Sequence, residues 1–387
     1  MKVRRLVFWL HLIVGVSIGL VVAFLAITGS ILAFQSQFIS WAERDARIGS
    51  LPTAGTCVLP SELLANASAD QAHSPSSLTL YADPHRPAEV AFGRTTLLAN
   101  GCTGQVIRRD AGRLRAFFSD IKDLHRWVAW GGVRHENLRA FKDAANLCFL
   151  FLLLSGAYLW IPRKLAWQNF KSGTMLRGRL KGRARDWSLH NVIGFWMVIP
   201  LVVIVSSGVI MAYPWANGLL YQAAGTPLQP GATEPSPKQS KPLNVEKYPV
   251  LDAAIQTAMT QNPHWQSLQM RMPGEKDGPI AFTLDEGNGG NPLQRTQLAV
   301  ARKDARVTRW EPFSANPRGR QWRLYARFLH TGEIFGLVGQ AVALFATLGA
   351  LVLVWTGFAL AIRRLAAWRS RTRKHSKDSR TRFEIYS

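Results

Sequence analysis

Four histidines stand out because they occur in two pairs of similar sequence contexts. His11 lies in an apolar run at residues 6–34, and His190 stands two residues before the start of an apolar run at residues 192–212. Both histidines are followed by glycines four and eighteen residues later, and eighteen residues are five helical turns, so each histidine shares one helix face with two glycines. These are Gly15 and Gly29 in the first run and Gly194 and Gly208 in the second.

His125 and His330 form the second pair. They stand in LHRWVAWGG and LHTGEIFG, ahead of apolar runs at residues 144–161 and 334–362. These two runs also correspond, since one carries SG before WIPR and the other TG before FALAIRR. The chain therefore contains an internal repeat of span, polar segment and span, and two repeats with the same direction predict a pseudo-twofold axis along the membrane normal.

Paired histidines at equal depth suggest a metal held from two opposite sides. Two neutral imidazoles suit the axial positions of a haem iron, and glycine lets a flat porphyrin lie against a helix. Gly15 and Gly194 would serve the pair His11 and His190, while Gly29 and Gly208, about 27 Å along the helix from the same histidines, would serve the other pair. Because the sequence has no C-x-x-C-H motif, we expect two non-covalent b-type haems.

The same residues could also serve simpler purposes in a membrane protein. A single membrane histidine can be a proton relay or a packing residue, and glycines alone can serve close helix packing. A structural zinc site needs four converging ligands, and no carboxylate or cysteine set completes either pair. His135, ten residues after His125, is an alternative outer ligand.

The elements that must position the histidines are membrane helices. The four apolar runs are each long enough to span a bilayer, so we predict an all-α bundle of four transmembrane helices in two parallel pseudo-repeats, with two small α+β domains outside the membrane. The net charge of +23 is concentrated beside the spans, on the side of both termini. This matches the positive-inside rule and argues for a lipid bilayer, not nucleic acid, as the partner.

The polar segments between the spans predict the two external domains. We expect a helix at 59–69 and strands at 77–82, 89–97 and 105–108 in the first, and a helix at 250–260 and strands at 267–272, 280–284, 297–302 and 307–310 in the second. Cys57 and Cys102 both lie in the first, where a disulfide could persist. The expected segments are span 1 (1–34), first external domain (35–119), interfacial segment and span 2 (120–162), basic cytoplasmic loop (163–187), span 3 (188–213), proline-rich linker and second external domain (214–325), span 4 (326–362) and basic cytoplasmic tail (363–387).

The histidine motifs, the W-x-P-R exit at Trp160 to Arg163 and the helix-and-strand order of the external domains resemble the PepSY-associated transmembrane family. NGCTGQV, at Asn100 to Val106, is similar to that family's D-P-x-T-G-x-V turn, with the Asp-Pro replaced. Within the family the chain is most similar to the ferri-siderophore reductases. The resemblance implies a bacterial inner-membrane protein with PepSY-like periplasmic domains that uses haem to reduce ferric siderophores in the periplasm.

In such a reductase, electrons would leave from the outer haem edge, without a catalytic acid and base. The sequence has no flavin or dinucleotide motif, so the donor would be a cytoplasmic partner, a reduced flavin or a membrane quinol. The alternatives are a non-catalytic receptor or inhibitor and a transporter. Residues at the outer rim could dock a chelate, or merely anchor the interface; they are Trp127, Trp130, Arg134, Arg320 and Trp322.

Overall fold

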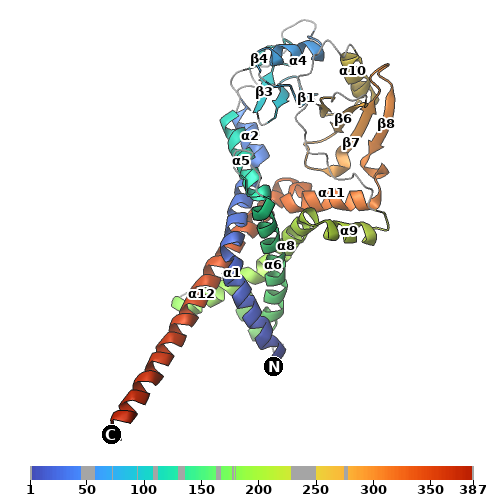
Figure 1. Cartoon of the computed structure of the whole chain (residues 1–387). Helices are drawn as coiled ribbons and strands as arrows, with labels where there is room; N and C mark the ends of the chain where they lie inside the picture. Colours follow the sequence, from blue (N-terminus) through green and yellow to red (C-terminus); the bar gives the residue numbers. More distant parts are fainter. Residues whose placement is uncertain are drawn as a thin grey trace.

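The computed structural model describes residues 2–44, 57–71, 73–93, 95–107, 112–129, 136–162, 167–176, 178, 180–227, 250–273 and 278–385. Nearly all of the proline-rich linker expected within 214–325 (its proline-rich residues run from 227 to 242) lies outside these ranges. A bundle of long helices carries a β-sheet at one end, and both chain termini lie at the other end (Figure 1).

Among the described residues, four helical stretches are long and apolar enough to cross a membrane. They are α1 (Lys2–Leu32), α6 (Glu136–Trp160), α8 (Gly182–Ala212) and Glu333–Ser370, which contains η4 (Glu333–Phe335) and the first part of α12 (Gly336–Ile385). All four correspond to the predicted apolar runs. Helices α1 and α8 each pack against both α6 and α12, so α1 and α8 stand diagonally across the bundle.

The bundle interior is filled by small and branched apolar side chains. Ala26, Leu201, Val205 and Ala346 are buried together at its centre. Small residues allow helix backbones to approach closely, which is how membrane helices gain packing energy where lipid supplies no hydrophobic driving force.

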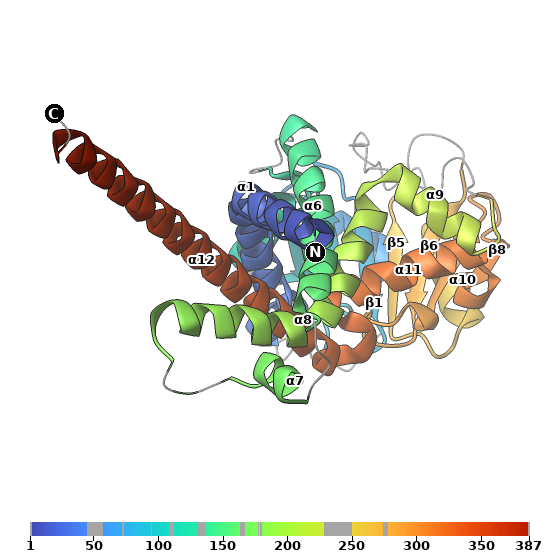
Figure 2. The same cartoon turned by 90° about the horizontal axis from the view of Figure 1, so that it is seen from below.

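Shorter helices continue the bundle at the sheet end. They are α2 (Gln35–Ala42), α5 (Gly112–Trp127), α9 (Pro214–Ala223) and α11 (Arg318–Thr331). Helix α5 packs on α1, and α11 packs on α8 and α9. Gly332 ends α11 in the left-handed conformation (φ 75°), which lets the chain turn from α11 into the last span. At the opposite end, α7 (Trp167–Thr174) packs on α8 (Figure 2).

The sheet has eight antiparallel strands in the order β4-β3-β2-β1-β5-β6-β7-β8. The first polar segment supplies β1 (Ser77–Tyr81), β2 (Ala88–Phe92), β3 (Thr95–Ala99) and β4 (Val106–Ile107). The second supplies β5 (Ser267–Arg271), β6 (Ile280–Asp285), β7 (Arg295–Val300) and β8 (Val307–Pro312), with η2 (Pro292–Gln294) and η3 (Phe313–Ala315) at its turns. Two domains were predicted, and the structure joins their strands in one sheet through the β1–β5 pair.

One face of this sheet is apolar and carries both helices of the polar segments. Helices α4 (Pro60–Ser68) and α10 (Leu251–Gln261) cover it, and Leu64, Leu251, Leu268 and Phe282 are buried in their shared core. Alternation of apolar and polar residues along each strand produces this one-sided burial. The two helices and most strands agree with the sequence prediction to within about two residues, the usual uncertainty of element ends.

The prediction of a single long strand at 89–97 is wrong. The structure has two strands there, β2 and β3, which pair in a tight hairpin around Gly93. Gly93 has a positive φ of 63°, a conformation that glycine adopts without steric cost. Apolar residues on both sides of the turn give the two strands the pattern of one continuous strand.

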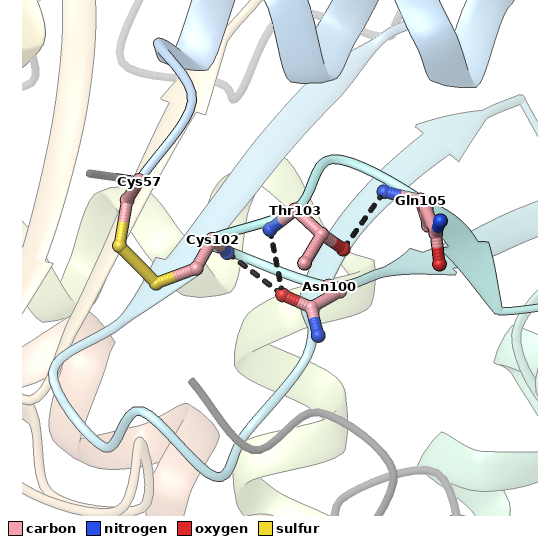
Figure 3. Close-up of a disulfide and its surroundings, with 5 residues drawn as sticks. All are labelled: Cys57, Asn100, Cys102, Thr103 and Gln105. Atoms are coloured by element: carbon pink, nitrogen blue, oxygen red, sulfur yellow. Dashed lines mark hydrogen bonds between the residues drawn. A yellow bond between two sulfur atoms is a disulfide. The ribbon is translucent and has the colours of Figure 1, made fainter. Parts of the chain in front are cut away.

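Cys57 and Cys102 form a disulfide, as the sequence suggested (Figure 3). Cys102 lies in the turn between β3 and β4, where the Asn100 side-chain carbonyl accepts hydrogen bonds from the backbone N–H groups of Cys102 and Thr103, both at 2.9 Å. The disulfide ties the segment before α4 to this turn.

Candidate functional site

The inner histidine pair joins the two diagonal helices of the bundle. His11 of α1 and His190 of α8 face each other with ring centroids 6.5 Å apart and ring planes at 87°. Because α1 and α8 are separated by α6 and α12 on either side, these two imidazoles meet in the middle of the bundle.

The outer pair lies at the sheet end of the bundle. His125 of α5 and His330 of α11 have ring centroids 6.2 Å apart and planes at 58°. Burial lowers the pKa of both imidazoles, and for His125 the neighbouring His330 lowers the pKa further. Both rings are therefore neutral at pH 7, the state in which imidazole binds a metal.

The spacing of each pair fits one metal ion between two imidazoles. A bond of about 2 Å from each ring nitrogen, plus about 1 Å from nitrogen to ring centre, places the centroids about 6 Å apart. The described residues contain no group of three or more histidine, cysteine or carboxylate side chains that could hold a metal. Two ligands suit a haem iron, whose porphyrin supplies the remaining donors, better than a four-ligand structural zinc site.

Each of the four rings makes a hydrogen bond through Nδ1 to a side-chain hydroxyl on a spanning helix. The pairs are His11 with Ser155 (2.9 Å), His125 with Thr28 (2.8 Å), His190 with Thr356 (2.9 Å) and His330 with Ser207 (3.1 Å). Because Nδ1 is engaged, Nε2 is the nitrogen left for a metal. In the sequence these hydroxyl residues stand out only as markers of the repeat.

Two of the four predicted glycines lie against the outer histidines. A Cβ atom added to Gly29 would stand 3.5 Å from Cε1 of His125, and one added to Gly208 would stand 3.4 Å from Cε1 of His330. Gly29 directly follows Thr28, and Gly208 directly follows Ser207. Because glycine has no side chain, the edge of an imidazole ring can lie against the helix backbone at each of these points.

The other two predicted glycines lie away from the histidines. Gly15 faces Leu152 of α6, and Gly194 faces Leu353 of α12. The inner rings lie instead against Gly156 and Gly357, where an added Cβ would stand 3.3 Å from Cε1 of His11 and 3.6 Å from Cε1 of His190. These glycines belong to the SG and TG dipeptides of the repeat, so their correspondence is visible in the sequence. Which histidine each glycine contacts depends on which helices pack together, and the sequence pattern does not specify that packing.

The two pairs are stacked along the bundle. On α1, His11 belongs to the inner pair and Thr28 contacts the outer pair; they are seventeen residues apart, about 25 Å along a helix. On α8, His190 and Ser207 have the same separation. The apolar bundle core fills the distance between the two levels.

A comparison with family models matches residues 8–364 to the PepSY-associated TM region. The chain belongs to this family. No match is found among curated proteins. The match runs through all four candidate spans and the sheet of this PepSY-associated protein.

The predicted outer rim is only partly brought together in this PepSY-associated protein. Trp127 ends α5 and lies under the Arg139 guanidinium, 4.3 Å from the ring centre. Trp322 lines an open apolar groove of about 260 Å³ between α8, α9 and α11. Arg320 is half-buried on α11. The other predicted residues of this region lie outside the described ranges; they are Trp130, Arg134 and the alternative ligand His135.

An ion-pair network fixes the helix that carries His125. Arg115 of α5 makes a bidentate contact with Glu43, just after α2, and its second bond to that carboxylate is 2.8 Å long. The same guanidinium reaches Glu89 of β2 at 3.2 Å. Arg115 therefore ties α5 both to the extension of α1 and to the sheet.

Charged side chains also hold the opposite end of the bundle. Asp186, four residues before His190, is almost completely buried and pairs with Arg185 at 3.1 Å and Arg363 of α12 at 3.2 Å. In the first repeat, Arg4 of α1 donates to the carbonyl oxygens of Leu159 and Ile161. Polar contacts of these side chains therefore join α1 to the end of α6 and α8 to α12, at the end of the bundle that carries the termini.

Proposed function

We propose that this PepSY-associated protein is a di-haem b reductase that carries electrons across a bacterial inner membrane to a ferric siderophore. The observation that supports it best is the spacing of two histidine pairs, 6.5 Å and 6.2 Å, at two levels of one bundle. His11 with His190, and His125 with His330, would hold the two haems. When bound, haem supplies a one-electron carrier at each level.

The residues around each pair prepare it for this role. The hydroxyl partners leave Nε2 free on each ring, and burial keeps the outer imidazoles neutral. The buried core between the two levels is apolar, with Ala26, Leu201 and Val205 at its centre. Such a core excludes water and protons while electrons pass.

Charge and cysteine chemistry support the direction of transfer. Basic residues gather at the bundle end that carries both termini, as expected of the cytoplasmic side. The disulfide lies at the sheet end, as expected in an oxidising periplasm. The ferric siderophore would accept electrons near α5 and α11, and iron would leave as Fe(II). The donor would be a cytoplasmic partner or the quinol pool.

Spectra of histidine variants test the haem assignment. The purified wild type should show a b-type reduced-minus-oxidised spectrum with about two haems per chain. His11→Ala or His190→Ala should remove the inner haem alone, and His125→Ala or His330→Ala the outer one. His264→Ala is the matched control, because His264 is exposed beside the sheet.

Two results would contradict the proposal. A colourless wild-type protein would favour a receptor or inhibitor, and retention of both haems in all four variants would refute the ligand assignment. The substrate is tested separately, by stopped-flow reoxidation of the dithionite-reduced protein with ferric siderophores. Reoxidation no faster than in buffer would remove the reductase function even if haem is present.

A further inference from the structure

Each of the four paired histidines rests on a Ser-Gly or Thr-Gly dipeptide of a spanning helix. The hydroxyl contacts Nδ1 and the glycine adjoins Cε1, so two neighbouring ring atoms are seated on two neighbouring residues. The same arrangement occurs at four places related by the repeat. The dipeptides are Thr28-Gly29, Ser155-Gly156, Ser207-Gly208 and Thr356-Gly357.

The direction of these hydrogen bonds follows from the helix backbone. Each hydroxyl lies within donating distance of a carbonyl oxygen one turn earlier, as in Thr28 to Phe24 (2.9 Å) and Thr356 to Val352 (2.7 Å). A hydroxyl has a single proton, so when it donates to the backbone it accepts from the imidazole. The proton of the ring is then on Nδ1.

His330 supports this tautomer independently. Its Nδ1 lies 2.8 Å from the carbonyl oxygen of Ile204, which can only accept. Ile204 precedes Ser207 by three residues. For each of the other three rings, a hydroxyl is the one hydrogen-bond partner of Nδ1 among the described residues.

His125, on the same outer centre as His330, lacks such a second acceptor. Among the described residues, the Thr28 hydroxyl is the one hydrogen-bond partner of its Nδ1. Removing the Thr28 hydroxyl therefore leaves His125 Nδ1 without an acceptor, whereas removing the Ser207 hydroxyl leaves His330 the carbonyl oxygen of Ile204.

We infer that Thr28, Ser155, Ser207 and Thr356 are positioning residues that fix the ligand tautomer and tune the haem potentials, with Thr28 more important than Ser207 at the outer centre. This rests on the proposed haem function. A hydrogen bond from Nδ1–H makes the imidazole a stronger donor to a metal, and loss of such an outer partner typically weakens metal binding by about 10–100-fold. A stronger donor favours ferric over ferrous iron, so losing the bond raises the midpoint potential.

The test compares two hydroxyls on the same outer centre. Thr28→Val and Ser207→Ala are prepared as full-length protein, and haem content and midpoint potentials are measured by potentiometric titration of the α-band. We expect Thr28→Val to raise the outer potential and weaken haem retention, and Ser207→Ala to have a smaller effect. Thr28→Ser and Ser207→Thr, which keep the hydroxyl, should keep wild-type values.

Ser17→Ala is the control, because the exposed Ser17 hydroxyl of α1 bonds only the carbonyl of Ile13 in its own helix. Potentials equal to that control in both hydroxyl variants, or a larger effect of Ser207→Ala than of Thr28→Val, would overturn the inference while the wild-type haem spectrum still upheld the reductase. If Thr28→Val fails to fold, Thr356→Val against Thr356→Ser at the inner centre still decides whether a hydroxyl sets the potential. A wild type without haem would refute the proposed function as well, and the two failures are therefore distinct.

Discussion

Replacing Arg115 should release the outer histidine without disturbing the inner pair. Arg115→Met keeps the bulk of the side chain but leaves the carboxylates of Glu43 and Glu89 without their cation. The side chains of Arg115, Glu43 and Glu89 are only 18%, 7% and 19% exposed, so this is a largely buried network. Removing one partner of a buried pair costs about 3–5 kcal/mol.

A local cost of about 3 kcal/mol raises the population of an undocked α5 by roughly a hundredfold. Because His125 is near the end of α5, we expect the proposed outer haem to be lost or bound weakly while the proposed inner haem stays. Haem stoichiometry and thermal unfolding in detergent measure both effects. The control is Arg309→Ala, whose partner Glu311 lies beside it on β8 in an exposed pair worth about 0–1 kcal/mol. If Arg115→Met keeps two haems and melts like the control, the network does not position His125.

Two further predictions concern the glycines and the disulfide. Gly156→Ala should disturb the spectrum of the proposed inner haem, because its Cβ would stand 3.3 Å from Cε1 of His11. Gly15→Ala, whose Cβ would stand 3.9 Å from Leu152, should leave that spectrum unchanged, and equal spectra of the two variants would show that the His11 ring does not lie against Gly156. Cys102→Ser opens a loop of 45 residues, so we expect the sheet to lose about 4 kcal/mol of unfolding free energy, and non-reducing mass spectrometry of the wild type should find the cysteines oxidised.

The histidine pairs could be predicted because the repeat makes them comparable. His11 alone is an isolated imidazole in an apolar run, but its match to His190 in spacing from two glycines fixes a common depth. The structure places these two rings together, and it also places His125 beside His330. Apolar periodicity was sufficient to locate the four spans and most strands, since burial in each case follows one helix stripe or one sheet face.

The contacts between elements could not be predicted in the same way. Gly15 lies on the same face of α1 as His11, yet the ring turns toward Gly156 of α6, because the choice of neighbouring helix depends on how the bundle closes. The pairing of β1 with β5, which places Leu78 opposite Met270, joins strands almost two hundred residues apart, and no local pattern specifies such a pair. Local propensity determines the elements, and packing determines their partners.

The ring planes give one more prediction, and it separates the two centres without a mutation. The inner imidazoles are nearly perpendicular, at 87°, while the outer ones are tilted by 58°. Two axial ligands with parallel planes split the iron d orbitals that bond with them, whereas perpendicular planes leave those orbitals nearly degenerate. If the two pairs hold haems as proposed, electron paramagnetic resonance of the oxidised protein should show two low-spin ferric signals, with the more anisotropic one from the inner pair. Loss of that signal in His190→Ala, and of the other in His330→Ala, would assign them; two identical signals would mean that haem binding reorients the rings.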